Sequence, residues 1–389
     1  MIRAVSPPLD SIREKVEAGV RLDAAECEML WDERIDLHEL GELANIVRER
    51  KNGNRGYYNI NTHLNPTNVC VYRCTFCAFR ADLREARGYV MSDEQIVARG
   101  AEAVAAGSTE MHIVGGLHHQ KDYDWYLNVV RLLHDHFPML HLKAWTPVEI
   151  NWFCHLTKRS TRDILVEMRD AGLGSLPGGG AEIFHPEVRD KICEHKADTQ
   201  EWFSIHRTAH ELGLRSNATM LYGHIENAFH RTDHLLRLRA LQDETGGFTA
   251  FICWSFQPDN TEMADIPPAG AFEYLKTQAV ARLYLDNVAN IQSSWVTQGE
   301  KTGQVALFFG ANDMGSLMIE ENVVSSAGTV HHLTLDSIRR CIREAGYIPR
   351  QRNVFYQFID EDPGPNPDAP SSPAPTPSHS LPVLAAGGS

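Results

Sequence analysis

Short apolar runs alternate along this chain with longer stretches in which apolar residues recur every three or four positions. The short runs have the length of buried strands, and the longer stretches have the period of amphipathic helices. Eight runs predict strands, at residues 57–63, 110–114, 140–145, 174–176, 216–221, 248–254, 290–295 and 314–319. Strands that alternate with helices indicate parallel pairing through crossover connections.

Helices are predicted between these strands, at residues 92–106, 123–136, 160–171, 199–212, 231–244, 272–285, 303–309 and 335–345. Eight strand–helix units favour a closed (β/α)8 barrel over an open sheet, and we expect this barrel to span residues 56–361. The active sites of such barrels lie at the C-terminal ends of the strands. The loops that follow the strands are therefore where chemistry is expected.

The segments on either side of the predicted barrel differ from it. Residues 1–55 are predicted to form a helical extension, in which Ser11-Ile-Arg-Glu14 has the form of a capping box. An apolar stripe in this extension contains Leu30, Leu37, Leu40 and Leu43. Residues 362–389 are rich in Pro, Ser and Ala and contain no Lys or Arg. Such a composition buries too little apolar surface to offset its ordering entropy, so we expect a disordered tail.

The chain is acidic, with 51 Asp and Glu, 37 Lys and Arg, and a formal net charge of −14. A nucleic-acid partner needs a basic surface, so this balance argues against nucleic-acid binding. There is no apolar run of 18 residues that would predict a membrane span, and residues 1–8 lack the apolar core of a signal peptide. Unpaired cysteines are typical of a reducing compartment, so a cytoplasmic location is expected.

Three of the eight cysteines are clustered, in the segment Cys70-Val-Tyr-Arg-Cys74-Thr-Phe-Cys77 after the first predicted strand. Thiolates are soft ligands that favour iron–sulfur clusters or zinc. Three of them on one loop can hold three irons of a [4Fe–4S] cluster and leave the fourth iron open to a small molecule. The alternative is a Cys3His zinc site completed by His63 or a distal histidine, but the second ligand pair that is usual in structural zinc sites is missing.

Glycines follow two further strands. Gly115-Gly116 ends the second strand, and Pro177-Gly-Gly-Gly-Ala-Glu182 follows the fourth. Glycine lets the backbone approach a ligand closely, although a tight turn explains a Gly-Gly pair equally well. The Glu182 carboxylate is suited to accept hydrogen bonds from ribose hydroxyls. Its other interpretation is an acidic residue placed near a helix N-terminus.

The remaining candidates are polar or aromatic residues that are expected near the strand ends. Glu149, after the third strand, and His224, after the fifth, are candidates for acid–base catalysis, as is His63 on the first. Other side chains that are expected to face the cavity are Tyr57, Asn61, Asn217, Thr219, Gln292 and Trp295. Possible carboxylate-binding arginines are Arg84, Arg87 and Arg207.

The cysteine spacing, with Phe76 before the last cysteine, resembles the radical S-adenosylmethionine (SAM) superfamily. The resemblance implies a [4Fe–4S] cluster held by Cys70, Cys74 and Cys77, whose open iron chelates SAM. It also implies that Phe76, Gly115 and Gly116, Glu182 and Asn217 lie in the cofactor site, with the glycine pair receiving the SAM amino group. The superfamily usually has Glu after this pair, whereas Leu117 and His118 follow here.

Within this superfamily the chain is most similar to aminofutalosine synthases of menaquinone biosynthesis, over roughly residues 50–358. The similar segments are Asn68–Phe79, Lys143–Ile150, Ser175–Phe184, His206–His210, Arg215–Glu226 and Gln242–Phe248. His119, where this branch commonly has Pro, and the insert at residues 151–158 depart from the pattern. Cyclic dehypoxanthinylfutalosine synthase and the deazaflavin-precursor synthase are sister enzymes of the same branch and remain alternatives. An iron–sulfur redox sensor is the alternative of another class.

The resemblance implies a transferase that forms a carbon–carbon bond. The 5′-deoxyadenosyl radical would add to 3-[(1-carboxyvinyl)oxy]benzoate, and loss of bicarbonate would give 6-amino-6-deoxyfutalosine. The implied partners are this small dicarboxylate, SAM as co-substrate, and an electron donor such as flavodoxin or ferredoxin.

Overall fold

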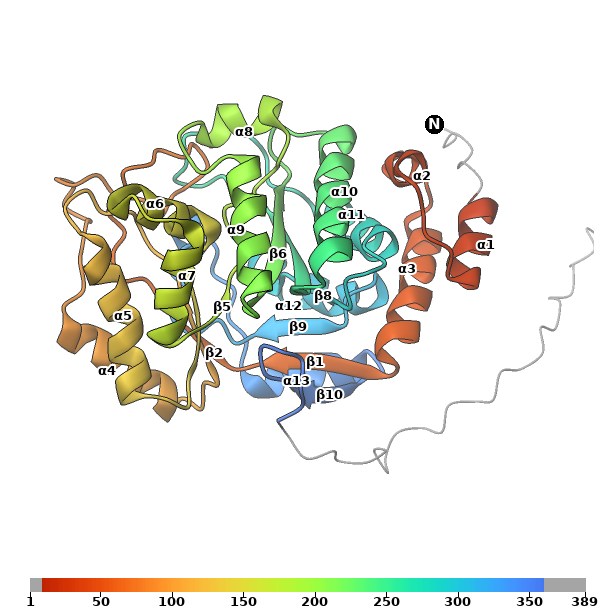
Figure 1. The fold of residues 1–389 in the computed structure, drawn as a ribbon. Helices are drawn as coiled ribbons and strands as arrows, with labels where there is room; N and C mark the ends of the chain where they lie inside the picture. The colour runs from red at the N-terminus through yellow and green to blue at the C-terminus, as the bar shows by residue number, and fades with distance from the viewer. Residues whose placement is uncertain (1–8, 360–389) are drawn as a thin grey trace, which may run out of the picture.

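Ten parallel strands form one sheet in the computed structural model of this protein, which describes residues 9–359 (Figure 1). The expectation for residues 362–389 lies outside the described residues. The order along the sheet is β10-β1-β9-β8-β7-β6-β5-β4-β3-β2. The strands are β1 (Arg55–Asn59), β2 (Asn61–Leu64), β3 (Glu110–Ile113), β4 (His141–Ala144), β5 (Leu173–Leu176), β6 (Arg215–Tyr222), β7 (Phe248–Ser255), β8 (Asn290–Gln292), β9 (Asp313–Ser316) and β10 (Ile348–Gln351).

The sheet closes on itself through residues 55–64. Only Ile60 separates β1 from β2. β1 pairs with β9, β2 pairs with β3, and the backbone beyond β9 continues alongside β2. There the N–H of His63 donates to the carbonyl of Ile319 at 2.7 Å, and the N–H of Ile319 donates to the carbonyl of Asn61 at 3.3 Å. β10 pairs with β1 and is additional to this closed ring. With β1 and β2 counted as one strand, the ring has eight strands, and the predicted parallel (β/α)8 barrel is confirmed.

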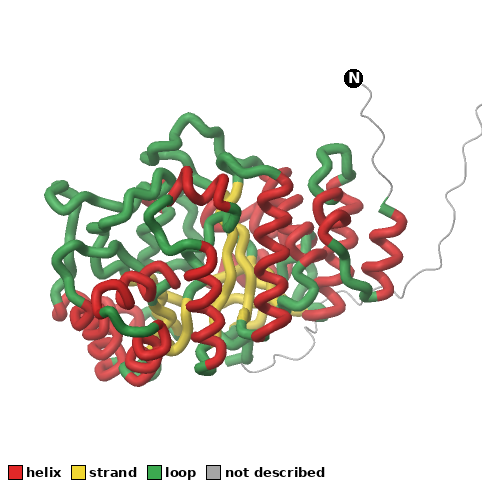
Figure 2. The backbone as a smooth tube through the Cα atoms, turned by 45° about the horizontal axis from the view of Figure 1, so that its top comes forward, coloured by secondary structure: helices red, strands yellow, loops and turns green. Residues whose placement is uncertain are grey.

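Helices surround the strands, as the tube in Figure 2 shows. Each buries one stripe of its surface: α5, for example, buries Tyr126, Val130 and Leu133 at the period expected for an amphipathic helix. The helices between strands are α4 (Asp93–Ala105), α5 (Tyr123–His136), α6 (Pro147–Thr157), α7 (Thr161–Asp170), α8 (Pro186–Cys193), α9 (Thr199–Glu211), α10 (Ala228–Thr245), α11 (Ala271–Tyr284), α12 (Trp295–Val305) and α13 (Leu335–Glu344).

Three helices precede the barrel, as expected: α1 (Asp10–Ala18), α2 (Ala24–Met29) and α3 (Leu37–Asn52). Their buried leucines belong to the same apolar core as α10 and α11. Trp31 donates its indole N–H to the hydroxyl of Thr232 on α10 at 3.0 Å, and Arg21 pairs with Asp243 at 2.6 Å. The extension is therefore docked on the barrel wall, although a division into domains at residue 55 stays a prediction.

Several local predictions were wrong. The predicted capping box at Ser11 does not form, because α1 already begins at Asp10 and no side chain caps its N-terminus. β8 ends at Gln292, and Trp295 starts a helix, α12, instead of ending a strand, whereas the predicted helix at residues 303–309 matches the end of α12 and the 3-10 helix Ala306–Phe308. The sequence analysis also missed α6, α8 and β10. The first two carry a readable signal, since Pro147 and Pro186 occupy their first turns.

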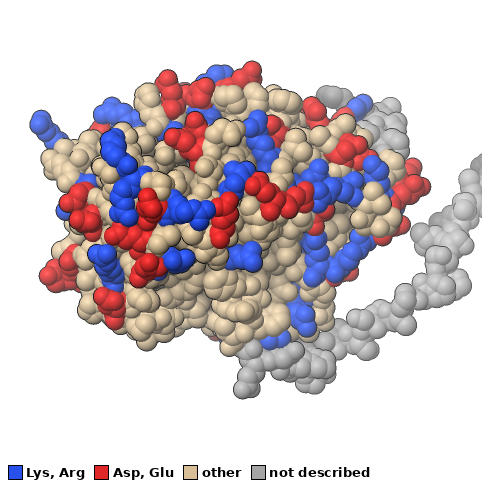
Figure 3. Space-filling view, viewed as in Figure 1, with Lys and Arg blue, Asp and Glu red and all other residues tan. Residues whose placement is uncertain are grey.

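Charges of both signs are interspersed over the face of the molecule drawn in Figure 3. Many of them form surface ion pairs, such as Arg207 with Glu244 at 2.5 Å. In residues 9–359 no helix is both long and apolar enough to cross a membrane.

A buried ion pair ties the last described strand to the barrel. Arg352, directly after β10, contacts the carboxylate of Asp313 on β9 at 2.6 Å, and the hydroxyl of Tyr356 donates to the same carboxylate at 2.6 Å. Asp313 is fully buried. Burial by itself lowers the pKa of Arg352, but Asp313 outweighs this effect and raises that pKa above its ordinary value.

Replacing Arg352 with Met is expected to destabilise the fold by about 3–5 kcal/mol, because it leaves the buried Asp313 without its cation. The free energy of unfolding in urea measures this loss. Arg207→Met is the control: it breaks an exposed pair and should cost no more than about 1 kcal/mol. Equal losses in the two variants would contradict the structural role given to Arg352.

Candidate active site

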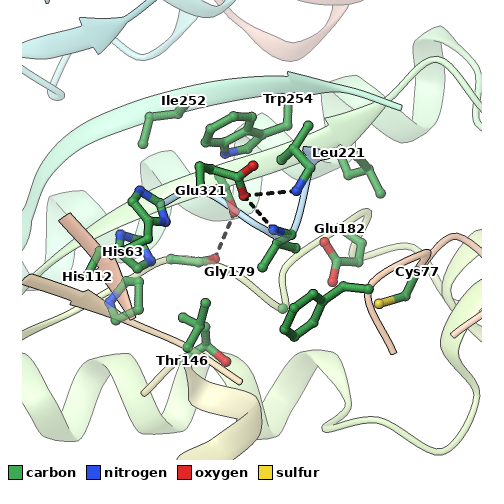
Figure 4. A pocket seen from close by; sticks show the side chains of 18 of the residues that line it. His63, Cys77, His112, Thr146, Gly179, Glu182, Leu221, Ile252, Trp254 and Glu321 are labelled. Atoms are coloured by element: carbon green, nitrogen blue, oxygen red, sulfur yellow. Dashed lines mark hydrogen bonds between the residues drawn. The ribbon is translucent and has the colours of Figure 1, made fainter. Parts of the chain in front are cut away.

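A cavity of about 370 Å³ occupies the interior of the barrel. Its walls follow the period of two that strands impose, because alternate side chains on a strand point to the same face. Asn59, Asn61 and His63 of the first strand line it, and so do Asn217, Thr219 and Leu221 of β6 and the terminal residues Ile252 and Trp254 of β7. In Figure 4, His63 and His112 lie at one end of the cavity, whereas Glu182 and Cys77 lie at the other. We call these the histidine end and the cysteine end.

The cysteine loop, residues 70–77, forms the wall at the cysteine end. Cys70, Cys74 and Cys77 all line the cavity together with Phe76. The loop is fixed from two sides: the N–H of Val71 donates to the carbonyl of Leu117 at 2.9 Å, and the N–H of Thr75 donates to the carbonyl of Ile192 at 3.0 Å.

The three thiols fit a multi-iron cluster better than a single zinc ion. All three are free. In a tetrahedral zinc site with Zn–S bonds of about 2.3 Å, neighbouring sulfurs lie about 3.8 Å apart. Among the described residues, the one group of three metal-ligand side chains within 4.8 Å of one another does not contain these cysteines. Burial raises the pKa of Cys70 and of Cys74, so both are protonated until a metal displaces the proton.

Gly115 and Gly116 follow β3, and Gly116 contacts the segment that leads into the cysteine loop. Gly115 lines the cavity, whereas Gly116 does not. Instead, the N–H of Gly116 donates to the carbonyl of Thr67 at 2.7 Å, and a Cβ atom at Gly116 would lie 2.2 Å from the carbonyl oxygen of Val69. Gly116 is therefore required for the close approach of two backbone segments, and it fixes where the cysteine loop starts.

The glycine triplet is held by side chains of β6. The N–H of Gly178 donates to the amide oxygen of Asn217 at 2.5 Å, and the hydroxyl of Thr219 donates to the carbonyl of Gly178 at 2.8 Å. A Cβ atom at Gly178 would lie 2.4 Å from the backbone oxygen of Asn217. Asn217 lines the cavity as expected, but its side-chain oxygen is used to position the glycine loop.

Glu182 lies at the cysteine end and forms a buried ion pair with Lys196. It does not cap a helix, because α8 starts at Pro186 and is preceded by His185. Burial alone raises the pKa of Glu182, but Lys196 outweighs it and holds that pKa below its ordinary value. The Lys196 ammonium also lies 5.2 Å from the centre of the Phe76 ring. No motif in the sequence pointed to Lys196, which follows α8 in a loop.

Glu149 and His63 line the cavity, whereas His224 does not. Glu149 accepts hydrogen bonds from the hydroxyl of Thr146 and from the N–H of Gly115, and burial raises its pKa. His63 stacks on His112 with 4.8 Å between ring centres. Burial and then Lys143 lower the pKa of His63 to about 4, so its imidazole is neutral at physiological pH.

His224 is held outside the cavity by its neighbours. Its Nδ1 accepts the N–H of Ile225 at 2.7 Å, its Nε2 donates to the carbonyl of Leu221 at 3.1 Å, and its side chain is fully buried. The structure therefore does not bring this expected acid–base residue to the cavity surface.

Some of the other side chains that were expected to face the cavity do so, and some do not. Gln292, Asn61 and Thr219 line the cavity, but Tyr57 and Trp295 do not. Tyr57 packs on Tyr356 and Phe358 at the far end of the strand. Arg207 pairs with Glu244 on the surface, and the remaining two arginines, Arg84 and Arg87, lie on the exposed loop after Phe79.

Besides Lys196, four charged cavity residues escaped the sequence analysis: Glu110, Lys143, Glu321 and Arg352. Glu321 follows β9 and accepts the backbone N–H groups of Val323, Val324 and Ser325 at 2.8–3.0 Å, and Figure 4 shows it beside the cavity. Burial raises the pKa of Glu321. Through these hydrogen bonds the Glu321 side chain fixes the backbone of residues 323–325, which follow β9 at the edge of the cavity.

A group of ligand-type side chains, His185, Glu187 and His230, lies outside the cavity. Its geometry favours a hydrogen bond between His230 and Glu187 over a metal site. Nδ1 of His230 accepts the N–H of Asn227 at 3.2 Å, so the neutral ring carries its proton on Nε2. That nitrogen faces Glu187 at 3.4 Å.

Comparison with known proteins places this geometry in a family. The model of the radical SAM superfamily matches residues 64–238, and the model described as the CofH/MqnC C-terminal region matches residues 245–363. At a TM-score of 0.68, the crystal structure of methylornithine synthase covers 87% of this chain and 97% of its own, with 18% sequence identity. That likeness supports the fold alone.

Relatives of nearly full length are more informative. An aminodeoxyfutalosine synthase of Thermus thermophilus is 42% identical to this chain, and the match covers 91% of this chain and 96% of the relative. The enzyme of the same name from Streptomyces coelicolor is 43% identical, and the match covers 94% of this chain and 97% of the relative. A cyclic dehypoxanthine futalosine synthase of Halalkalibacterium halodurans is 38% identical over 90% of this chain and 95% of its own. The chain therefore belongs to the radical SAM superfamily, in the family of the aminodeoxyfutalosine synthases and their CofH/MqnC relatives.

Proposed function

We propose that this protein is an aminodeoxyfutalosine synthase. The observation that carries the proposal is the placement of Cys70, Cys74 and Cys77 at one end of a closed cavity in a chain 42–43% identical to enzymes of that name. In the reaction, the 5′-deoxyadenosyl group of SAM joins the alkene carbon of 3-[(1-carboxyvinyl)oxy]benzoate, and a carboxyl group leaves as bicarbonate. The relatives with cyclase names are less similar, at 38%.

The cysteine end has the donors that a cluster and SAM require. We assign Cys70, Cys74 and Cys77 as the ligands of three irons in a [4Fe–4S] cluster, with the fourth iron open to SAM. When bound and reduced, the cluster supplies the electron that cleaves SAM to methionine and the 5′-deoxyadenosyl radical. The wide spacing of the sulfurs and the burial of the Cys70 and Cys74 thiols support this assignment.

The protein residues bind, orient and exclude water. Glu182 is placed to accept the ribose hydroxyls of SAM, since it lies beside the glycine triplet, where backbone approaches the cavity. Glu149 is held by Thr146 and accepts the N–H of Gly115 at 3.3 Å, beside the glycine pair after which the superfamily usually has Glu, and we assign it to the SAM amino group. Apolar side chains of β6 and β7 keep the space between the two ends dry, namely Leu221, Ile252 and Trp254.

An external electron donor, a flavodoxin or ferredoxin, is part of the proposal, because the cluster must be reduced before it can cleave SAM. A cytoplasmic location is part of it as well. All eight cysteines are free, which is typical of a reducing compartment.

The reaction itself tests the function. Protein with a reconstituted cluster, dithionite, SAM and 3-[(1-carboxyvinyl)oxy]benzoate should yield an adduct whose mass retains adenine and the benzoate ring. The Cys74→Ala variant should yield neither this adduct nor 5′-deoxyadenosine. Cyclisation of dehypoxanthinylfutalosine by the wild type, without any adduct, would instead identify the sister enzyme. A protein that never cleaves SAM would fit the iron–sulfur sensor.

Glu182→Gln is expected to weaken SAM binding by roughly ten-fold or more, because charged hydrogen bonds contribute about 1.5–3 kcal/mol each. Calorimetric titration of the cluster-loaded variant with SAM measures the change, and Glu187→Gln on the exposed start of α8 is the control. The single variant leaves Lys196 unpaired, so the Glu182→Gln/Lys196→Met double variant is needed as well. SAM affinity equal to that of the wild type in either variant would remove Glu182 from the SAM site.

Gly116→Ala is expected to reduce the iron content after reconstitution and to destabilise the fold by about 1–3 kcal/mol, because the added methyl group overlaps the backbone at Val69. Iron analysis and thermal unfolding measure both effects. Gly270→Ala is the matched control, since no atom lies within 4 Å of the added methyl group. Normal iron content in Gly116→Ala would show that the cysteine loop does not depend on this contact.

A further inference from the structure

The histidine end of the cavity carries a row of three side chains from neighbouring strands. In the parallel register, His63 of β2 lies beside His112 of β3, and His112 lies beside Lys143 of β4. Residues paired in this way point to the same face of a sheet, and all three line the cavity. The Lys143 side chain is 13% exposed and lines the cavity, and it also borders a smaller pocket that is lined by Ser175 and Ser216.

Lys143 has hydrogen-bonding capacity to spare. Its ammonium forms an ion pair with Glu110, whose other oxygen accepts the amide N–H of Asn59 at 3.0 Å. Burial alone raises the pKa of Glu110, but Lys143 outweighs burial and lowers it. An ammonium has three N–H donors, and Glu110 is the partner that the described residues provide.

Next to this pair, a polar group lacks a partner. The side-chain oxygen of Asn61 is buried and accepts no hydrogen bond from the described residues. Asn61 is register partner to Glu110 and is 4% exposed. Rotation of the Asn61 side-chain amide by 180° exchanges the positions of its oxygen and its NH2 group, so it can offer either an acceptor or a donor. The histidine end is therefore equipped to receive a polar group of a ligand.

The other cations of the cavity are less available. Two guanidinium nitrogens of Arg352 contact the Asp313 carboxylate, and the third donates to the carbonyl of Asn353. Lys196 is held by Glu182 at the cysteine end. The neutral rings of His63 and His112 add no charge, because burial lowers the pKa of both. Lys143 is thus the cation that faces the histidine end.

We propose that Lys143, held in place by Glu110, binds the ring carboxylate of the substrate. This inference rests on the proposed function. The alkene of 3-[(1-carboxyvinyl)oxy]benzoate must lie toward the cysteine end, where the radical is formed. The ring then points to the opposite end of the cavity, and its carboxylate, meta to the ether oxygen, is directed toward Lys143. This contact fixes the alkene at one distance from the cysteine end, so Lys143 is a substrate-binding residue that determines specificity.

The test compares two substrates in two proteins. The substrates are 3-[(1-carboxyvinyl)oxy]benzoate and the analogue in which hydrogen replaces the ring carboxylate. The wild type should prefer the dicarboxylate in kcat/KM, and Lys143→Met should reduce this preference roughly ten- to hundred-fold, as expected for the loss of one charged hydrogen-bonded contact. The change should appear mainly in KM for the dicarboxylate, since the contact is present before and during the reaction.

Controls separate binding from folding. Iron content and SAM affinity of Lys143→Met should equal those of the wild type. Because this variant leaves Glu110 unpaired, the Glu110→Gln/Lys143→Met double variant, without either charge, should lose the preference as well. Lys191→Met, on the exposed face of α8, should keep it.

The outcomes are distinguishable. A preference retained by both Lys143 variants, while the wild type forms the adduct, would overturn the assignment of Lys143 and leave the proposed function intact. No adduct from the wild type would overturn the proposed function, and the substrate assignment with it. A lost preference in both variants, with normal SAM affinity, supports the proposal.

Discussion

The whole site depends on one strand segment that pairs with both ends of the sheet. Residues 55–64 contact β9 through their first half and β3 through their second, and the backbone near Ile319 completes the closure. Without this closure the alternate residues Asn59, Asn61 and His63 would face one side of an open sheet. With it, they and the equivalent residues of the other strands face one shared interior. The cavity is thus a direct result of the parallel register.

Charge inside this interior is tolerated because it is paired. Three carboxylates that would be costly alone each contact a cation: Glu110 with Lys143, Glu182 with Lys196, and Asp313 with Arg352. Removing one partner from such a pair is far more costly than removing both. Each pair also holds its cation in one position, which is what recognition of a negatively charged ligand requires. The cavity is thus polar at its two ends, where the ion pairs lie, and apolar between them, where residues of β6 and β7 line it.

The sequence analysis expected the two glycine motifs to let the backbone approach a ligand, but the structure shows a second role for them. Gly116 and Gly178 are needed where backbone meets backbone, at Val69 and at Asn217. Both contacts position loops that line the cysteine end. Gly116 therefore supports the site from behind, whereas Gly178 contacts Asn217 and also lines the cavity, as do Gly115 and Glu182.

The sequence by itself determined the barrel, because the period of its apolar residues and the alternation of strands and helices are local properties. It also determined that three cysteines share one loop, since their spacing is a property of eight consecutive residues. Its errors at Ser11 and Trp295 concern helix ends, where a shift of one or a few residues changes the local pattern very little.

Only the tertiary structure decided which polar residues face the cavity. Lys143, Lys196 and Arg352 carry no motif, and they reach the site because strand register, a loop after α8 and the strand β10 bring them there. His224 follows a strand in the expected way, yet local hydrogen bonds hold it outside the cavity. Pairing of charges from distant segments is a property of three-dimensional packing, and for this reason the chain could be assigned to a family before its substrate-facing residues could be named.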